Sequence, residues 1–194
     1  MSTVDKAKLR AVYLRKRKML SSDQCAFLSQ QITNRLITFL GMQRFKMVHV
    51  FLPILKHNEI NTWPIVQYLK ERGTTVVVSK SNVESNELTH FIFEHESQLE
   101  NNKWGIPEPT FGQEVLSGEL DIILIPMVTF DRRGHRIGYG KGYYDKFLSD
   151  CRDTCIKVGL SMSPPLDVIS CTDPFDIALD YCVTPLKTYS FGHE

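Results

Sequence analysis

The sequence has no long apolar run and no secretory signal. Its longest uninterrupted apolar segments stay far below the roughly 18 residues that cross a bilayer, so no transmembrane helix is predicted. The N-terminus lacks the apolar core of a signal peptide, although basic residues near serines also occur in organelle transit peptides. We expect a cytoplasmic protein that does not contact a membrane.

Cysteine pairing signals are also missing. The chain has five cysteines and no C-x-x-C pair, and an odd number fits poorly with a complete disulfide framework. Cys151 and Cys155 would share one helix face, but no histidine lies at a spacing that would complete a zinc site. The sequence therefore predicts reduced thiols and no structural metal.

The chain lacks a broad basic surface. Its formal net charge is +1, and positive charge is concentrated in residues 1–20, so the rest of the chain is net acidic. A nucleic-acid-binding protein usually spreads basic groups over a larger face and interleaves aromatic side chains, whereas this segment has Tyr13 alone. Nucleic acid is not an expected partner.

What is present is a pattern of alternating helices and strands. Two helices open the chain, within residues 5–20 and from the capping box formed by Ser21 and Gln24 to about Gly41. A third is expected at residues 61–72. Strands are expected at residues 47–52, 74–78, 89–94, 122–125, 156–161 and 181–184.

This alternation indicates the α/β class. At 194 residues the chain suits one domain, and we expect residues 1–194 to form a single three-layer domain with a mostly parallel, Rossmann-like central sheet flanked by helices. The order of the strands is left open by the pattern. Residues 104–109 are expected to be irregular, because Pro107 and Pro109 would prevent regular backbone pairing.

The most informative segment is the glycine-rich stretch Asp131–Asp145. Its three alternating glycines would let backbone N–H groups approach an anion, and a helix is expected to begin directly after them. The alternative is a tight turn whose glycines only permit positive φ, but the cations Arg136 and Lys141 favour a phosphate ligand. The stretch matches neither G-x-G-x-x-G nor the Walker A motif.

Its surroundings resemble a known family. Residues 130–145 are similar to the signature of the 5-formyltetrahydrofolate cyclo-ligase (5,10-methenyltetrahydrofolate synthetase) family, in which this segment binds ATP and helps to close the folate site. Weaker matches follow the family's order at residues 6–10, 58–60 and 104–109. The resemblance therefore spans nearly the whole chain.

The resemblance implies a set of ATP-binding residues. They are Lys6, Arg10, Arg136, Gly138, Tyr139, Gly140, Lys141, Gly142 and Tyr144. Among these, Arg136 and Lys141 are expected to be catalytic, because a planar bidentate cation and a mobile point charge would neutralise the triphosphate. Lys6 and Arg10 are four residues apart and so face the same side of a helix, where two cations could meet phosphates.

The resemblance also implies substrate and metal contacts. Substrate binding is implied for Leu52, Glu59, Trp104 and Tyr143. Magnesium ligation is implied for Asp145 and Asp180. An acid at position 59 would bind the amino-bearing edge of the pterin, and the aromatic rings would form walls around the substrate.

Plainer alternatives stay open for several of these residues. Core packing is the alternative for Leu52, Trp104 and Tyr144, and surface solubility is the alternative for Glu59. Asp145 could serve only as a helix-dipole partner, and Asp180 as an ordinary strand-edge acid. No role is assigned to residues 15–18, which would form a solvated basic face, or to residues 132–133.

The activity implied by the resemblance is ATP- and Mg²⁺-dependent cyclisation of 5-formyltetrahydrofolate to 5,10-methenyltetrahydrofolate, with release of ADP and phosphate. Transfer of the γ-phosphoryl group to the formyl oxygen would give an iminium phosphate that N10 attacks, and alignment with charge neutralisation would suffice for this step. A sugar-phosphate isomerase and a nucleic-acid module anchored by the basic N-terminal helix are the alternatives. We expect a monomer.

Overall fold

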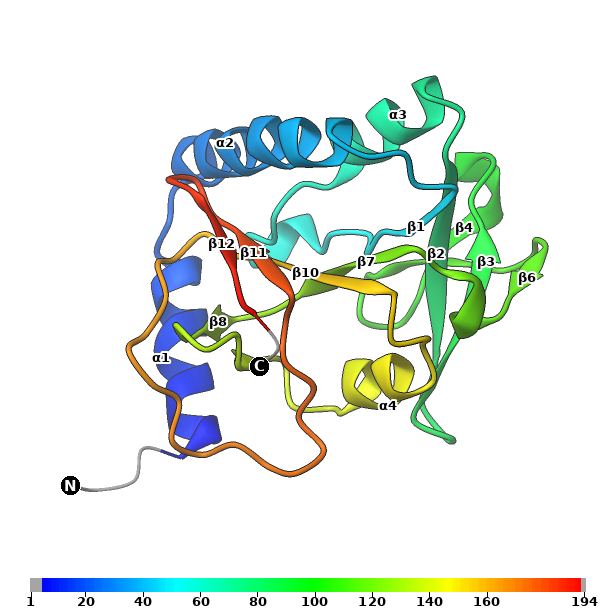
Figure 1. The fold of residues 1–194 in the computed structure, drawn as a ribbon. Coiled ribbons are helices and arrows are strands. Elements are labelled where there is room, and N and C mark those ends of the chain that lie inside the picture. The colour runs from blue at the N-terminus through cyan, green and yellow to red at the C-terminus, as the bar shows by residue number, and fades with distance from the viewer. Residues whose placement is uncertain (1–4, 193–194) are drawn as a thin grey trace.

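The fold is built around one eight-stranded sheet. The computed structural model describes residues 5–192. The strand order is β12-β11-β10-β7-β1-β2-β3-β6, and the five strands from β11 to β2 are parallel, while β12 pairs antiparallel with β11, β3 with β2, and β6 with β3. The expected mostly parallel α/β sheet is therefore confirmed (Figure 1).

The helices and the strands of the large sheet have the following bounds. The helices are α1 Lys6–Lys18, α2 Ser22–Gly41, α3 Trp63–Glu71 and α4 Tyr143–Ser149. The strands are β1 Met47–His49, β2 Thr75–Asn82, β3 Glu87–Ile92, β6 Glu114–Val115, β7 Ile122–Pro126, β10 Ile156–Leu160, β11 Tyr181–Val183 and β12 Thr188–Ser190. No helix within residues 5–192 is both long and apolar enough to span a membrane.

Two small hairpins and three short 3-10 turns complete the fold. The hairpins pair β4 Leu99–Asn101 with β5 Pro107–Pro109, and β8 Thr129–Phe130 with β9 Arg136–Ile137. The turns are η1 Leu55–His57, η2 Glu96–Gln98 and η3 Ser117–Glu119.

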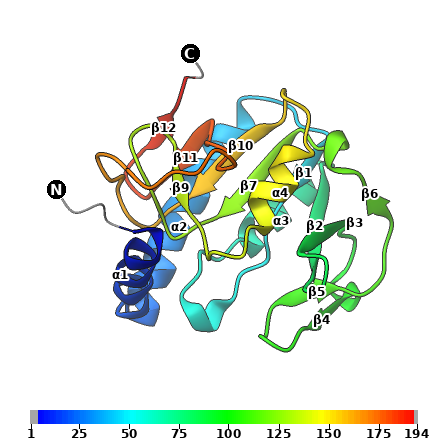
Figure 2. The ribbon, with the colours of Figure 1, turned by 90° about the horizontal axis from the view of Figure 1, so that it is seen from below.

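The sheet is covered on both faces. Helices α2 and α3 lie over one face and α4 lies over the other (Figures 1 and 2). Successive residues of β7 show why: Ile122 and Leu124 pack in the core beneath α2 and α3, whereas Ile123 and Ile125 pack with Phe147 of α4. A strand buried on both faces reads as a continuous apolar run, as β7 does.

The helix boundaries follow from local signals. Ser21 and Gln24 form the predicted capping box, in which the Ser21 hydroxyl accepts from the Gln24 N–H at 3.2 Å and the Gln24 side chain accepts from the Ser21 N–H at 2.9 Å. Pro64 occupies the first turn of α3, where a missing N–H costs no hydrogen bond.

The expectation of an irregular segment holds for residues 104–106 but is wrong for residues 107–109, because Pro107–Pro109 forms β5. An antiparallel pair exchanges hydrogen bonds at every second residue. In this hairpin the bonds run between Asn102 and Ile106 and between Gln98 and Thr110. Both prolines therefore fall at positions that need no N–H donor toward the partner strand.

The chain direction places two loops at one point of the sheet. From β1 the chain continues to β2 on one side, whereas from β7 it continues to β10 on the other side. Ligands of open α/β sheets bind in the crevice outside the carboxyl ends of two strands that diverge in this way. The segments that follow β1 and β7 contain most of the predicted site residues.

A row of polar side chains is buried between the sheet and α4. Ser79 lies between two histidines, with its Oγ 2.6 Å from Nε2 of His49 and 2.9 Å from Nδ1 of His90. Both imidazole rings pack against Phe147, with centroid distances of 4.9 Å and 4.1 Å. Burial lowers the pKa of His49 well below its usual value and that of His90 to about 4.

Because the pKa values of these two buried histidines are lowered, we expect acid to destabilise the fold. Between about pH 6.5 and 4 these histidines are protonated in the unfolded chain but stay neutral in the folded protein. The free energy of unfolding therefore falls as the pH falls. From pH 7.5 to 5.0 we expect a loss on the order of 2 kcal/mol for each of His49 and His90. Urea unfolding at both pH values measures it.

Two variants refine this measurement. His90→Phe should make the loss of unfolding free energy at pH 5.0 smaller, whereas replacement of the exposed His57 by glutamine should leave the loss unchanged. Equal unfolding free energies of the unsubstituted protein at the two pH values would contradict a neutral, buried histidine pair.

Candidate active site

The glycine-rich segment leaves the sheet through the β8–β9 hairpin. A buried carboxylate shapes its turn: Asp131 accepts hydrogen bonds from the backbone N–H groups of Arg133, His135 and Ile169, each at 2.9 Å. These bonds hold the hairpin against the segment after β10. Asp131 thus has a structural role that the sequence motif did not reveal.

Two of the three glycines, Gly138 and Gly140, lie against Arg10 of α1. The Nε of Arg10 donates to the carbonyl oxygen of Gly138 at 2.8 Å. Gly140 and Gly142 have φ values of 87° and 74°, a region that strains other residues. At Gly140 a Cβ would lie 2.7 Å from Cζ of Arg10, so a larger residue at this position would displace the guanidinium.

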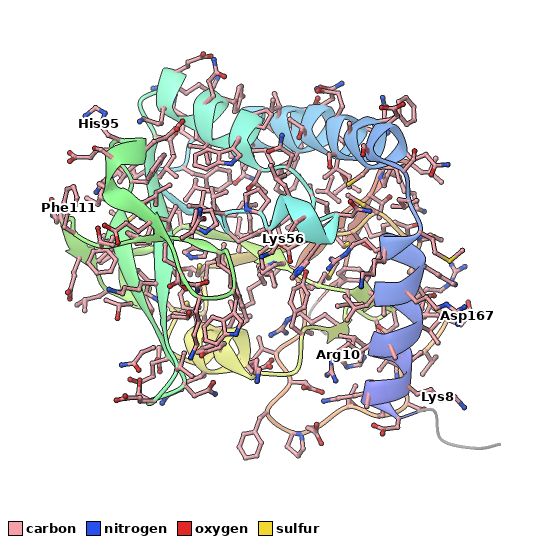
Figure 3. The ribbon with its side chains drawn as sticks, turned by 180° about the vertical axis from the view of Figure 1, so that it is seen from behind. Lys8, Arg10, Lys56, His95, Phe111 and Asp167 are labelled. Carbon is pink, nitrogen blue, oxygen red and sulfur yellow. The ribbon has the colours of Figure 1, made fainter. Side chains whose placement is uncertain are left out.

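The first helix presents Arg10 to this loop, whereas Lys6 contacts a different segment. Figure 3 shows Arg10 on the side of α1 that faces the loops, whereas Lys8 points away from the molecule. Lys6, one turn earlier, forms ion pairs of 2.5 Å with both Asp173 and Asp176. Partial burial acts to lower the pKa of Lys6, but these hydrogen bonds outweigh it and raise the pKa. A phosphate at Lys6 would take the place of the two carboxylates.

Arg136 connects three parts of the site. Its side chain is 6% exposed, and its guanidinium forms an ion pair of 2.6 Å with Asp145 in the first turn of α4. It also donates to the carbonyl oxygen of Ile177. The predicted catalytic cation and one predicted metal ligand are therefore in direct contact.

Lys141 and Tyr143 lie beside the β2–β3 turn. The carbonyl oxygen of Lys141 accepts from the side-chain amide of Asn86 at 2.8 Å, and the Tyr143 hydroxyl lies 3.5 Å from the carbonyl oxygen of Asn82. The Lys141 side chain is exposed, and no ion pair within residues 5–192 involves it. Its charge is free to meet a ligand.

Glu59 is buried, with 5% of its surface exposed, so the surface alternative is wrong for it. Its carboxylate accepts from the backbone N–H of Ile54 at 2.8 Å. Asn58 adopts a left-handed conformation, and its amide donates to the carbonyl oxygens of Arg17 and Leu20 at the end of α1. The turn after η1, which precedes Glu59, is thus fixed to the end of α1.

The glycine-rich loop reaches Glu59 through Tyr139. The Tyr139 hydroxyl donates to the Glu59 carboxylate and accepts from the guanidinium of Arg17 at 2.7 Å. Burial and the charge of Glu59 raise the pKa of Tyr139, so the hydroxyl stays protonated at neutral pH. The loop expected to bind ATP and the acid expected to bind folate therefore meet at one hydroxyl.

The expectation of a solvated basic face at residues 15–18 is wrong for Arg17, which contacts Tyr139. Its guanidinium also lies over the Tyr139 ring, 5.4 Å from the centroid, whereas Arg15, Lys16 and Lys18 are exposed. A signal was available in the sequence, because Arg17 follows Arg10 by seven residues. Two helical turns place both on the same face of α1.

Tyr144 and Leu52 are both packed against neighbouring side chains. Tyr144 packs on Phe147 of its own helix at 5.8 Å between ring centroids, and Leu52 belongs to the core under α2. Burial and the charge of Glu59 raise the pKa of Tyr144, while Arg136 acts in the opposite direction. The charges of Glu59 and Arg136 thus both act on the Tyr144 hydroxyl, and the contact of Tyr144 with ATP stays a prediction.

Trp104 is on the surface, with 43% of its area exposed, so a core role is wrong for it. It precedes Gly105, where a Cβ would lie 2.6 Å from Nζ of Lys56. Lys56 belongs to η1 and lies between α1 and the β4–β5 hairpin (Figure 3). The Trp104 loop thus lies beside the segment that leads to Glu59.

The two predicted metal ligands have different partners. Asp145 contacts Arg136, whereas Asp180 accepts from the Lys157 backbone N–H at 2.6 Å and lies 3.6 Å from Lys157 Nζ, at the amino end of β10. In the described part of the chain, no three His, Cys, Asp or Glu side chains gather as a metal site. Mg²⁺ takes many ligands from phosphates and water, which suits a site with Asp145 as a protein ligand.

Comparison with known proteins identifies the fold and the family. The model of the 5-formyltetrahydrofolate cyclo-ligase family matches residues 2–185. The chain belongs to this family. The mouse 5-formyltetrahydrofolate cyclo-ligase is 31% identical over 77% of this chain and 77% of its own length. The Escherichia coli K12 enzyme is 28% identical over 91% of this chain and 98% of its own length.

Solved cyclo-ligase structures share the architecture. The 5,10-methenyltetrahydrofolate synthetase of Aquifex aeolicus superposes with a TM-score of 0.83 at 29% identity, covering 97% of this chain and 94% of that one. The Mycoplasma pneumoniae synthetase gives 0.75 at 26% identity, covering 94% and 99%. The expectations of the family and of an enzyme are confirmed, which sets aside the isomerase and nucleic-acid alternatives.

Proposed function

We propose that this cyclo-ligase converts 5-formyltetrahydrofolate to 5,10-methenyltetrahydrofolate while ATP is converted to ADP and phosphate. The observation that carries the proposal is the contact between Tyr139 and Glu59. It joins a glycine-rich loop suited to phosphates to a buried carboxylate suited to the amino-bearing edge of a pterin. Both lie outside the carboxyl ends of β1 and β7, the crevice favoured for ligands.

The phosphate half of the site consists of cations and backbone donors. Arg10 lies against Gly138 and Gly140, and Lys141 is exposed beside them. A triphosphate along this loop would meet both cations, and Lys6 would join them after leaving Asp173 and Asp176. Asp145 would hold Mg²⁺, which would supply neutralisation of the phosphate charge when bound.

The folate half would orient the formyl group toward the phosphates. Glu59 would bind the pterin edge by charge-assisted hydrogen bonds, and the ring of Tyr143, at the start of α4, would form an aromatic wall of the substrate site. Holding the formyl oxygen in line with the γ-phosphorus turns a bimolecular encounter into an intramolecular step.

The reaction then needs alignment of the formyl oxygen with the γ-phosphoryl group and neutralisation of the negative charge on that group. The formamide oxygen is a poor leaving group, and its phosphorylation makes an iminium phosphate that the N10 amine attacks before phosphate departs. Arg136 and Lys141 would neutralise the negative charge on the transferred group, and no protein nucleophile takes part.

A coupled assay tests the proposal. The purified protein is incubated with 5-formyltetrahydrofolate, Mg²⁺ and ATP, and methenyl absorbance and ADP are followed together. We expect one ADP for each methenyl product and loss of both signals when ATP is omitted. Methenyl formation at the same rate without nucleotide would refute the coupling.

A further inference from the structure

The Tyr139 hydroxyl occupies a position between a carboxylate and a guanidinium. It donates its proton to Glu59 and accepts a hydrogen bond from Arg17 at 2.7 Å. One small group therefore presents a donor to the acid and an acceptor to the cation. Any ligand that replaces the hydroxyl must offer the same pattern, or it leaves a buried charge without a partner.

Arg17 also faces an apolar hollow. A cavity of about 20 Å³ adjoins it. Among its walls are Ile60, Met127, Leu160 and Met162. Leu160 ends β10, and the other three residues follow β1, β7 and β10, so the hollow lies at the carboxyl ends of the strands. It is too small for a pterin, and Tyr139 has to move aside before a flat ring can reach Glu59 and Arg17.

The pterin ring of 5-formyltetrahydrofolate carries the required pattern on one edge. Its N3–H and 2-amino group are donors, and the 4-oxo oxygen beside N3 is an acceptor. A carboxylate that pairs with the two donors leaves the oxygen directed at the neighbouring group. In this site, the neighbour of Glu59 across the Tyr139 hydroxyl is the guanidinium of Arg17.

We propose that Arg17 binds the 4-oxo oxygen of the substrate, and that the Tyr139 hydroxyl holds this place until folate displaces it. The inference rests on the proposed function and adds a substrate-binding residue to it. Arg17 makes the site selective for a 4-oxo pterin, because a 4-amino group would turn donors toward the guanidinium. Glu59 adds selection of its own, because N3 of a 4-amino pterin carries no hydrogen, and the contribution of Arg17 is therefore read from the change that its substitution causes for each ligand.

The test compares two ligands that differ at this atom. Binding of 5-formyltetrahydrofolate and of its 4-amino analogue is measured by calorimetry without ATP, for the unsubstituted protein and for Arg17→Met. We expect Arg17→Met to weaken binding of the 4-oxo ligand roughly ten- to hundredfold, as for loss of a charged hydrogen bond, and not to weaken binding of the 4-amino ligand.

Two further variants serve as controls. Arg15→Met removes an exposed arginine from the same helix and should leave both affinities unchanged. Arg17→Gln keeps an N–H donor and should retain more affinity for the 4-oxo ligand than Arg17→Met does. Circular dichroism and melting temperature confirm that each variant is folded.

The outcomes separate this inference from the proposed function. If Arg17→Met weakens both ligands equally, or neither, Arg17 only clamps Tyr139 and the inference is wrong, while turnover by the unsubstituted protein still supports the proposed function. If the unsubstituted protein neither binds nor cyclises 5-formyltetrahydrofolate, the proposed function fails and the inference fails with it.

Discussion

Arg136→Met is expected to lower kcat for ATP-dependent cyclisation about a thousandfold, the scale of losing an arginine that neutralises a transferring phosphoryl group. The guanidinium is almost fully buried and bonds to both Asp145 and Ile177. Its removal would take away a charge near the reacting groups and the group that orients Asp145. Steady-state rates at saturating ATP and folate measure the effect.

Arg132→Met is the matched control for this variant. Arg132 lies in the same hairpin, but it is exposed and its partner Asp167 is exposed too, so activity should be unchanged. Arg136→Lys should recover only part of the rate, because an ammonium cannot bond to two acceptors in the planar geometry of a guanidinium. Activity of folded Arg136→Met within tenfold of the unsubstituted rate would contradict the catalytic assignment.

Lys141→Met is expected to lower kcat/KM for ATP about a hundredfold, as for removal of one preorganised charge from a transition state. The side chain is exposed and has no ion pair among the described residues. Its loss should therefore leave the melting temperature unchanged. Activity and thermal unfolding, measured on the same preparation, separate a lost ligand contact from a damaged fold.

The control for Lys141→Met is Lys146→Met. Lys146 lies on α4 and pairs with Glu87 on the exposed surface, a contact of the kind that contributes little. We expect full activity from this control. A Lys141→Met protein as active as the Lys146→Met protein would show that the glycine-rich loop does not need its lysine.

Local signals explain why much of the fold could be predicted from the sequence. The capping box of Ser21 and Gln24 involves neighbours in the chain, and the apolar run of β7 reports burial on both faces. The glycines at 140 and 142 carry the positive φ values that their loop requires. Each of these features is decided within a few residues.

The rest depended on contacts between distant segments. Lys6 meets Asp173 and Asp176, and Arg17 meets Tyr139, across more than a hundred residues of chain. No spacing rule relates such positions, because the sheet order brings them together. The error at Pro107–Pro109 had a different cause, since the proline rule applies only to hydrogen-bonded positions of a strand.

The most direct test of the account follows the formyl oxygen itself. 5-Formyltetrahydrofolate labelled with ¹⁸O in the formyl group is converted with ATP and Mg²⁺, and the released phosphate is analysed by mass spectrometry. If the γ-phosphoryl group is transferred to the formyl oxygen, each phosphate carries one ¹⁸O atom. Phosphate without the label, with ¹⁸O released into water, would contradict phosphorylation of the formyl group.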